Sequence, residues 1–247
     1  MEALSNPFYL LLVLLPLAAF LYASVGHGGA SSYIALLTLF EIIPAETRPA
    51  ALILNIGVSG IAFISFYKRV QFPKSLFLSL ILFSIPASFA GGLFLLDAHI
   101  YKKVLGVLLL FPTIRLLNIF SSKEIKPIER KIWMAPLLGL AIGFVSGLIG
   151  IGGGIILSPI ILFLDWTDLK QTAAVSALFI FLNSISGLIG ISITGFHLPD
   201  GFEWMIPITL FGGFIGGYAG ANKFNSPAMR ISLAVVLAVA SIKFILF

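Results

Sequence analysis

Apolar residues in this chain gather in long runs that short polar stretches separate. In the first half the runs lie near 8–25, 31–42, 49–67, 75–96 and 101–120. In the second half they lie near 134–149, 155–164, 172–194, 204–221 and 227–246. The runs are continuous, whereas the strands of a membrane barrel alternate apolar and polar residues. They therefore predict helices, which satisfy their own backbone hydrogen bonds in lipid, and an all-α polytopic membrane protein.

Two of these runs, 31–42 and 155–164, are too short to cross a membrane alone. At about 1.5 Å per residue, each covers roughly half of a hydrocarbon core of about 30 Å. Each follows a glycine-rich break, GHGGA at 26–30 and GIGGG at 150–154. The pattern is typical both of a re-entrant helical hairpin and of a spanning helix that is broken by glycine.

The two glycine breaks belong to a longer internal repeat. Residues 20–61 align with residues 144–185 without a gap, at the constant offset of 124 positions that separates Gly26 from Gly150. Such repeats are common in secondary transporters. We expect a first transmembrane repeat at 1–120, a cytoplasmic linker at 121–131 and a second transmembrane repeat at 132–247. Each repeat is expected to hold one hairpin followed by three transmembrane helices.

The basic residues of the loops indicate how the repeats are oriented. Lysine and arginine occur at 68–74, in the linker 121–131 and at 222–230, but not in the loop 195–203. Loops rich in lysine and arginine stay in the cytoplasm. This distribution requires an even number of crossings between the linker and the long helix that follows the second break. A hairpin that enters and leaves on one side supplies it, so the sequence predicts two inverted repeats.

Composition agrees with a membrane protein and narrows its chemistry. Of 247 residues, 59% are hydrophobic and 10% are charged, against roughly a quarter charged in soluble domains. There is no cysteine, which excludes disulfides and thiolate metal sites. The sequence indicates no metal site, no cofactor, no nucleotide-binding loop and no catalytic group, so we expect a transporter and not an enzyme. The net charge of +5 lies mostly in loops and indicates topology rather than nucleic-acid binding.

The glycine breaks are the candidate binding site. Irregular backbone at membrane depth occurs where it is buried in protein or lines a wet cavity. A new helix begins after each break, and its first N–H groups and its dipole favour an anion. Close helix packing is the competing interpretation, and it suits Gly91, Gly92 and the glycines at 212–220 better. The candidate substrate-binding residues of the breaks are Gly26, His27, Gly28, Gly29, Ala30, Ser31, Ser32, Gly150, Gly152, Gly153, Gly154 and Ile155.

Polar residues near the breaks are further candidates. His27 is the only histidine in an apolar context, so it is the candidate for proton coupling. A neutral histidine bonded to a helix carbonyl is the alternative. Asn55 and Asn183 lie in the long helices after the breaks, where they either face a cavity with the substrate or bond a neighbouring helix. Arg48, at a helix start, either guides an anion or is an interfacial charge.

The two breaks resemble the motifs of a known family. SGLIGIGGGIILSPIILF at 146–163 is similar to the signature of the sulfite exporter TauE/SafE family, also called the toluene sulfonate uptake permease family. VGHGGASSYIALLTLF at 25–40 looks like its counterpart in the first half. The resemblance covers nearly the whole chain. It implies a permease for small sulfur-containing anions such as sulfite, sulfoacetate and other sulfonates, and for other small organic acids. The first motif departs from the pattern at His27 and Ala30, where the second has Ile151 and Gly154.

The sequence therefore predicts a secondary transporter that binds a small anion near the midplane, at the helix N-termini of the two breaks. Coupling to protons is expected. A passive anion channel and a carrier of another small organic acid are the alternatives, and electrogenic flux without proton movement would favour the channel. The expected location is the cytoplasmic membrane of a bacterium or archaeon, with the lipid bilayer and the small anion as partners.

Overall fold

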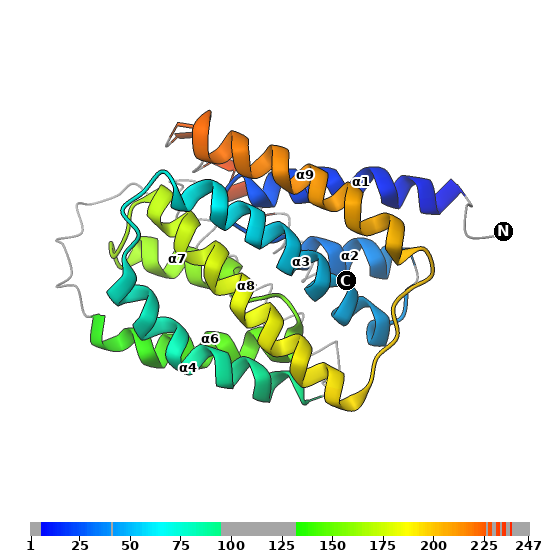
Figure 1. Ribbon diagram of the computed structural model, residues 1–247, viewed down its shortest axis with the longest axis horizontal. Helices are drawn as coiled ribbons and strands as arrows, with labels where there is room; N and C mark the ends of the chain where they lie inside the picture. The colour runs from blue at the N-terminus through cyan, green and yellow to red at the C-terminus, as the bar shows by residue number, and fades with distance from the viewer. Residues whose placement is uncertain are drawn as a thin grey trace.

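A computed structural model of the chain describes residues 6–40, 42–94 and 132–225, together with some residues between 227 and 238. The regular structure of these residues is helical, as the apolar runs predicted, and no strand occurs among them. The elements are α1 (Asn6–Ala23), α2 (Ala30–Leu39), α3 (Pro44–Tyr67), α4 (Lys74–Gly92), the 3-10 turn η1 (Ile132–Met134), α6 (Ala135–Ile149), α7 (Gly154–Phe163), α8 (Leu169–Thr194) and α9 (Phe202–Asn222) (Figure 1). The predicted helix at 101–120, the linker 121–131 and most of 227–246 lie outside the described residues.

Five helical segments are long and apolar enough to cross a membrane. They are Ala45–Tyr67, Lys74–Gly92, Ile132–Ile149, Leu169–Thr194 and Phe202–Asn222. In contrast, α2 and α7 have 10 residues each. At about 1.5 Å per residue they are roughly 15 Å long, which agrees with the half-length segments that the sequence predicted.

Two helices begin earlier than the apolar pattern predicted. We expected the third segment to start near Pro49, but α3 starts at Pro44, which sits in its first turn with Glu46. Proline at the first helical position needs no N–H partner, and an acidic residue there suits the helix dipole. We expected the long helix of the second half to start at Thr172, but α8 starts at Leu169. Asp168 and Gln171 form a capping box that closes its N-terminus.

The helices α3 and α8 form the centre of the molecule, where they lie side by side and run in opposite directions (Figure 1). α9 packs on α3 and α4 packs on α8, while α1 covers α9 and α6 covers α4. Each contact has a counterpart when α1 is exchanged with α6, α3 with α8, and α4 with α9. The bounds of α2 and α7 differ by the same 124 positions as the sequence repeat. The packing of the described helices thus follows the repeat.

Glycines bring the helices of two pairs into backbone contact. They are Gly212, Gly216 and Gly220 of α9, which face α1, and Gly139, Gly143 and Gly147 of α6, which face α4. A Cβ atom on any of them would overlap the backbone of the facing helix. The packing interpretation of the glycines at 212–220 is therefore confirmed. It also holds for Gly91 and Gly92, which abut the backbones of α6 and α8.

This packing makes Gly216→Ala destabilising although alanine is the better helix former. The added methyl group would overlap the backbone of Phe20, and overpacking of this kind costs about 1–3 kcal/mol. Gly60→Ala is the matched control, because its Cβ would make only ordinary contact with Phe181, at 3.4 Å. It should keep or raise stability, by about 0.5–1 kcal/mol. Thermal unfolding of both variants in one detergent tests this, and equal unfolding midpoints would contradict it.

Candidate functional site

Two tight loops set the N-termini of α2 and α7. Gly29 and Gly153 are the N-cap residues of these helices, with φ of 95° and 78°. Gly26 and Gly150, three residues earlier, have φ of 78° and 84°. Glycine adopts positive φ without the steric penalty that a side chain imposes. The two breaks therefore share left-handed glycines at two pairs of equivalent positions, but they differ at the third pair, where Gly152 has a φ of 73° and Gly28 does not have a positive φ.

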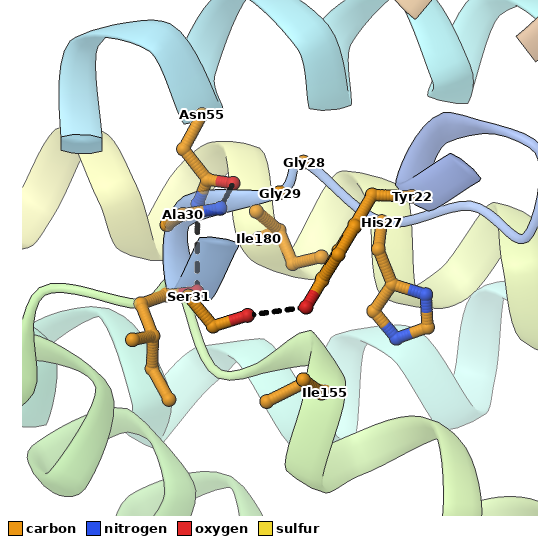
Figure 2. Close-up of a pocket in the computed structure, with 10 residues that line it drawn as sticks. Tyr22, His27, Gly28, Gly29, Ala30, Ser31, Asn55, Ile155 and Ile180 are labelled. Carbon is orange, nitrogen blue, oxygen red and sulfur yellow. Dashed lines mark hydrogen bonds between the residues drawn. The ribbon is translucent and has the colours of Figure 1, made fainter. Parts of the chain in front are cut away.

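The two breaks meet around one small buried cavity (Figure 2). Its lining residues are Tyr22, His27, Gly28, Gly29, Ala30, Ser31, Asn55, Ile151, Ile155 and Ile180. The cavity volume is about 10 Å³, which is roughly the room that one water molecule needs. An anion such as sulfite is larger than this, so it could occupy the site only after the lining residues move apart.

The walls of the cavity differ in chemistry. The first half of the chain contributes the N-terminus of α2 and the side chains of Tyr22, His27, Ser31 and Asn55, and the second half contributes three isoleucines. The Tyr22 hydroxyl lies 2.7 Å from the Ser31 hydroxyl (Figure 2). Within this lining there is no lysine, arginine or acidic residue. The polar groups that face the cavity are therefore hydroxyls, an amide, an imidazole and backbone.

The side chain of Asn55, on α3, contacts both breaks. Its Oδ1 accepts a hydrogen bond from the N–H of Ala30, at 3.1 Å, and so caps the first turn of α2. Its Nδ2 donates to the Ser184 hydroxyl at 2.8 Å and lies 3.5 Å from the carbonyl oxygen of Ile151. Asn55 is fully buried. A single amide thus joins the two glycine motifs and α8.

The loops close tightly on this amide. A Cβ atom on Gly28 would overlap Oδ1 of Asn55. A Cβ atom on Gly152 would lie 2.5 Å from Nδ2 of Asn55 and 2.7 Å from the Ser184 hydroxyl. Both positions therefore require glycine because the backbone approaches Asn55 so closely.

His27 also bonds residues of the second half of the chain. Its Nε2 lies 3.1 Å from the carbonyl oxygen of Gly154 and 3.1 Å from the Ser158 hydroxyl, which bonds the Ser176 hydroxyl at 2.6 Å. A carbonyl oxygen only accepts, so this bond requires a hydrogen on Nε2. The neutral ring then leaves Nδ1 as an acceptor, and Nδ1 is buried without a hydrogen-bond partner among the described residues. At Nε2, the observed contact is the one expected of a neutral histidine bonded to a helix carbonyl, which was the alternative to proton coupling.

The cavity gathers only part of the predicted substrate-binding set. The predicted residues that line it are His27, Gly28, Gly29, Ala30, Ser31, Ile155 and Asn55. The predicted residues outside the lining are Gly26, Ser32, Gly150, Gly152, Gly153, Gly154, Asn183 and Arg48. The glycines of the second motif therefore lie outside the cavity lining. No described residues form a group of three or more histidines and carboxylates that could hold a metal ion.

Asn183 and Arg48 bond to neighbouring helices. Asn183 is buried on α8, accepts from the Ser84 hydroxyl of α4 at 2.6 Å and donates to the Phe179 carbonyl at 2.8 Å. Asn183 thus bonds a neighbouring helix, as one of the two interpretations of this residue expected. The Arg48 guanidinium donates to the carbonyl of Gly147 at 3.1 Å, near the C-terminus of α6, where partial negative charge favours a cation. Roles of either residue in substrate binding remain predictions.

Sequence reasoning missed four residues of the site. Tyr22, Ile151 and Ile180 line the cavity, and Ser158 bonds His27. Ser158 follows Gly154 by four residues, so it lies on the same face of α7, and this spacing was a usable signal. Tyr22 occupies an ordinary position in an apolar helix, and no sequence pattern distinguishes it.

Comparison with known proteins places the whole chain in one family. The model of the family described as "Sulfite exporter TauE/SafE" matches residues 10–244. A protein of Sinorhizobium fredii named "Probable membrane transporter protein y4hK" is 35% identical over 229 residues, which cover 91% of this chain and 93% of its own. The "Probable membrane transporter protein YdhB" of Bacillus subtilis is 25% identical over 244 residues, 92% of this chain and 95% of its own. No solved structure matches the chain significantly.

The family match extends over both glycine breaks and all the described helices except the first turn of α1. The relatives from S. fredii and B. subtilis, which match over nearly their full length, both carry the names of membrane transporters and not of enzymes. The chain thus belongs to the sulfite exporter TauE/SafE family and is a multi-pass integral membrane transporter.

Proposed function

We propose that this transporter is a secondary carrier of a small sulfur-containing anion such as sulfite or an organosulfonate, and that it is coupled to protons. The description of the matching family names sulfite export, which supports this substrate class. The anion would bind near the midplane, where α2 and α7 begin.

The observation that carries the proposal is the N-terminus of α2 at a buried polar cavity. The first N–H groups of a helix and its dipole attract negative charge. Ser31 and Tyr22 add hydroxyl donors beside that end, and His27 adds an imidazole. The N-terminus of α7 adjoins the same cavity through Ile155. This set suits an anion that must also be released, because it holds no fixed cationic side chain.

The small volume of the cavity favours a carrier over a passive channel. A channel needs a continuous wet path, whereas a carrier passes through a closed state and alternates access to its site. With about 10 Å³, the site corresponds to a closed state. The two contacts that join the halves across the cavity, at Asn55 and His27, would have to open during transport.

We further propose that the halves 1–120 and 132–247 are inverted repeats joined by a cytoplasmic linker at 121–131. Corresponding helices run in opposite directions, α1 against α6, α3 against α8 and α4 against α9 (Figure 1). The loop between α3 and α4 lies at the opposite end of the helices from the loop between α8 and α9 (Figure 1). Both features support inversion. The lysines and arginine at 68–74 assign the first of these ends to the cytoplasm.

Site-directed labelling tests this topology, and the chain offers a clean background because it lacks cysteine. Gln71 and Asp200 are exposed and lie in the two loops at opposite ends. Gln71→Cys should react with an impermeant thiol reagent only from the cytoplasm, and Asp200→Cys only from outside. The cysteine-free parent protein is the control for background. Labelling of both from one side would contradict the inversion.

Flux into proteoliposomes tests the substrate and the mechanism together. Vesicles holding the purified protein should take up sulfite or sulfoacetate, and a pH gradient should drive accumulation. Thiosulfate and acetate serve as comparison anions. Equal transport of acetate would indicate a general organic-acid carrier. Electrogenic anion flux that ignores the pH gradient would indicate a channel, and flux no faster than in protein-free vesicles with all four anions would reject the proposed function.

A further inference from the structure

The repeat is broken at the residue that caps α2. The residue that follows Asn55 by 124 positions is Phe179, whose ring approaches within 3.0 Å of a Cβ atom built on Gly153. A polar amide therefore covers the N-terminus of α2, whereas an aromatic ring covers the N-terminus of α7. Among the described residues, the first N–H of α2 donates to a side chain, the Asn55 amide, whereas the N-cap of α7 has no side-chain hydrogen bond. The starts of α2 and α7 therefore differ in the side chains that cover them.

The Asn55 amide holds the position that an anion oxygen would take. Its Oδ1 accepts from the N–H of Ala30, which is the first N–H of α2, and Asn55 itself lines the cavity. A second feature of the same cavity also points to a ligand, since the buried Nδ1 of His27 has no partner in the described part of the chain. An anion entering this cavity competes with the Asn55 oxygen for the N–H of Ala30.

The other end of the same amide joins the halves. Nδ2 donates to Ser184 on α8 and approaches the carbonyl of Ile151 in the second break. Because an amide group is planar and rigid, its oxygen and nitrogen move together. Turning Oδ1 away from Ala30 therefore also pulls Nδ2 away from the second half. Hydrogen bonds to an anionic acceptor are roughly twice as strong as bonds between neutral groups, which favours the anion in this exchange.

We propose that Asn55 is the positioning residue that couples anion binding to the release of the second break and of Ser184 from α3. In the closed site the amide oxygen of Asn55 accepts the hydrogen bond from the N–H of Ala30. The arriving anion displaces this oxygen, the amide turns, and the second break loses its contact with α3. The inference rests on the proposed anion site, but it concerns what Asn55 does when that site fills.

Binding and turnover measured separately test this coupling, with sulfite and sulfoacetate as probes. Asn55→Ala removes the competitor at Ala30 and the link to Ser184, so affinity should rise several-fold while turnover falls about tenfold or more, the effect of losing one well-formed hydrogen bond to the coupling step. Asn55→Asp places a carboxylate against the same N–H, so affinity should fall about tenfold or more. Ser186→Ala is the matched control, because Ser186 is a buried residue of α8 that bonds the Ile85 carbonyl of α4 and lies outside the cavity lining. Affinity and turnover should both stay near the parent values in this control, or change in the same direction. Weaker binding in Asn55→Ala, or changes equal to those of the control, would overturn the proposal.

A second measurement needs no ligand. A single Ile180→Cys reporter at the cavity should react with a small thiol reagent slowly in the parent and about tenfold faster when combined with Asn55→Ala, because the closing contact is gone. Combination with Ser186→Ala should leave the rate near that of the parent. Equal rates in both combinations would reject Asn55 as the closing residue. If neither probe binds but the rates differ as expected, the proposed substrate fails while the closing role of Asn55 stands.

Discussion

Gly152→Ala should abolish transport. Gly152 has a φ of 73°, in which an L-residue is strained by about 1–2 kcal/mol. Its Cβ would lie 2.5–2.7 Å from Asn55, Ile180 and Ser184, and such overpacking adds about 1–3 kcal/mol. The methyl group would also push the Asn55 amide from both of its contacts. We expect flux at the level of protein-free vesicles and a lower thermal unfolding midpoint.

Gly150→Ala separates backbone strain from this collision. Gly150 has a φ of 84°, but its Cβ would meet only Arg48, at an ordinary 3.5 Å. The variant should lose about 1–2 kcal/mol of stability and retain transport. Gly28→Ala isolates the other component, because it collides with Asn55 while its φ is not in the left-handed region. Retained transport in Gly152→Ala, or its loss in Gly150→Ala and not in Gly28→Ala, would show that contact with Asn55 is not what matters.

The breaks could be predicted from sequence because a tight turn with positive φ requires glycine, and this requirement is local. A tight turn with positive φ excludes most side chains whatever surrounds it, so Gly26, Gly29, Gly150 and Gly153 signal the turns by themselves. The bounds of α2 and α7 also differ by the 124 positions that separate the two glycine motifs in the sequence. The helix starts at Pro44 and Leu169 were missed because the first turns of α3 and α8 contain polar residues and proline and lie outside the apolar runs.

The partners of the site could not be predicted in the same way. Asn55 bonds residues that are 25, 96 and 129 positions away, and no local pattern encodes such separations. Asn55 and Asn183 looked alike in sequence, each a lone amide in a long helix after a break. Packing separates them, since one faces the cavity and the other faces Ser84 of α4. The departure from the repeat at His27 and Ala30 was the one sequence feature that indicated unequal halves.

His27→Gln should uncouple transport from the pH gradient while leaving anion binding nearly intact. The glutamine amide can place an N–H donor near the position of Nε2, so the bond to the Gly154 carbonyl can persist. Glutamine has no group that takes up a proton near neutral pH, whereas an imidazole that is exposed to water does. Accumulation driven by a pH gradient should fall to the level seen without a gradient. Exchange of labelled for unlabelled sulfite, which needs no net proton movement, should continue.

His27→Leu shows what the contact itself contributes. Leucine fills similar space but leaves the Gly154 carbonyl without its imidazole donor, and a buried polar group that loses its partner costs about 1–3 kcal/mol. The leucine variant should therefore lose stability and exchange together, whereas the glutamine variant keeps both and loses only the response to pH. Sulfite exchange and pH-driven uptake, measured for both variants in one lipid mixture, separate the two roles. If pH-driven uptake in His27→Gln equals that of the parent, His27 joins the halves but carries no proton, and the coupling proton must travel on another group or on the substrate itself.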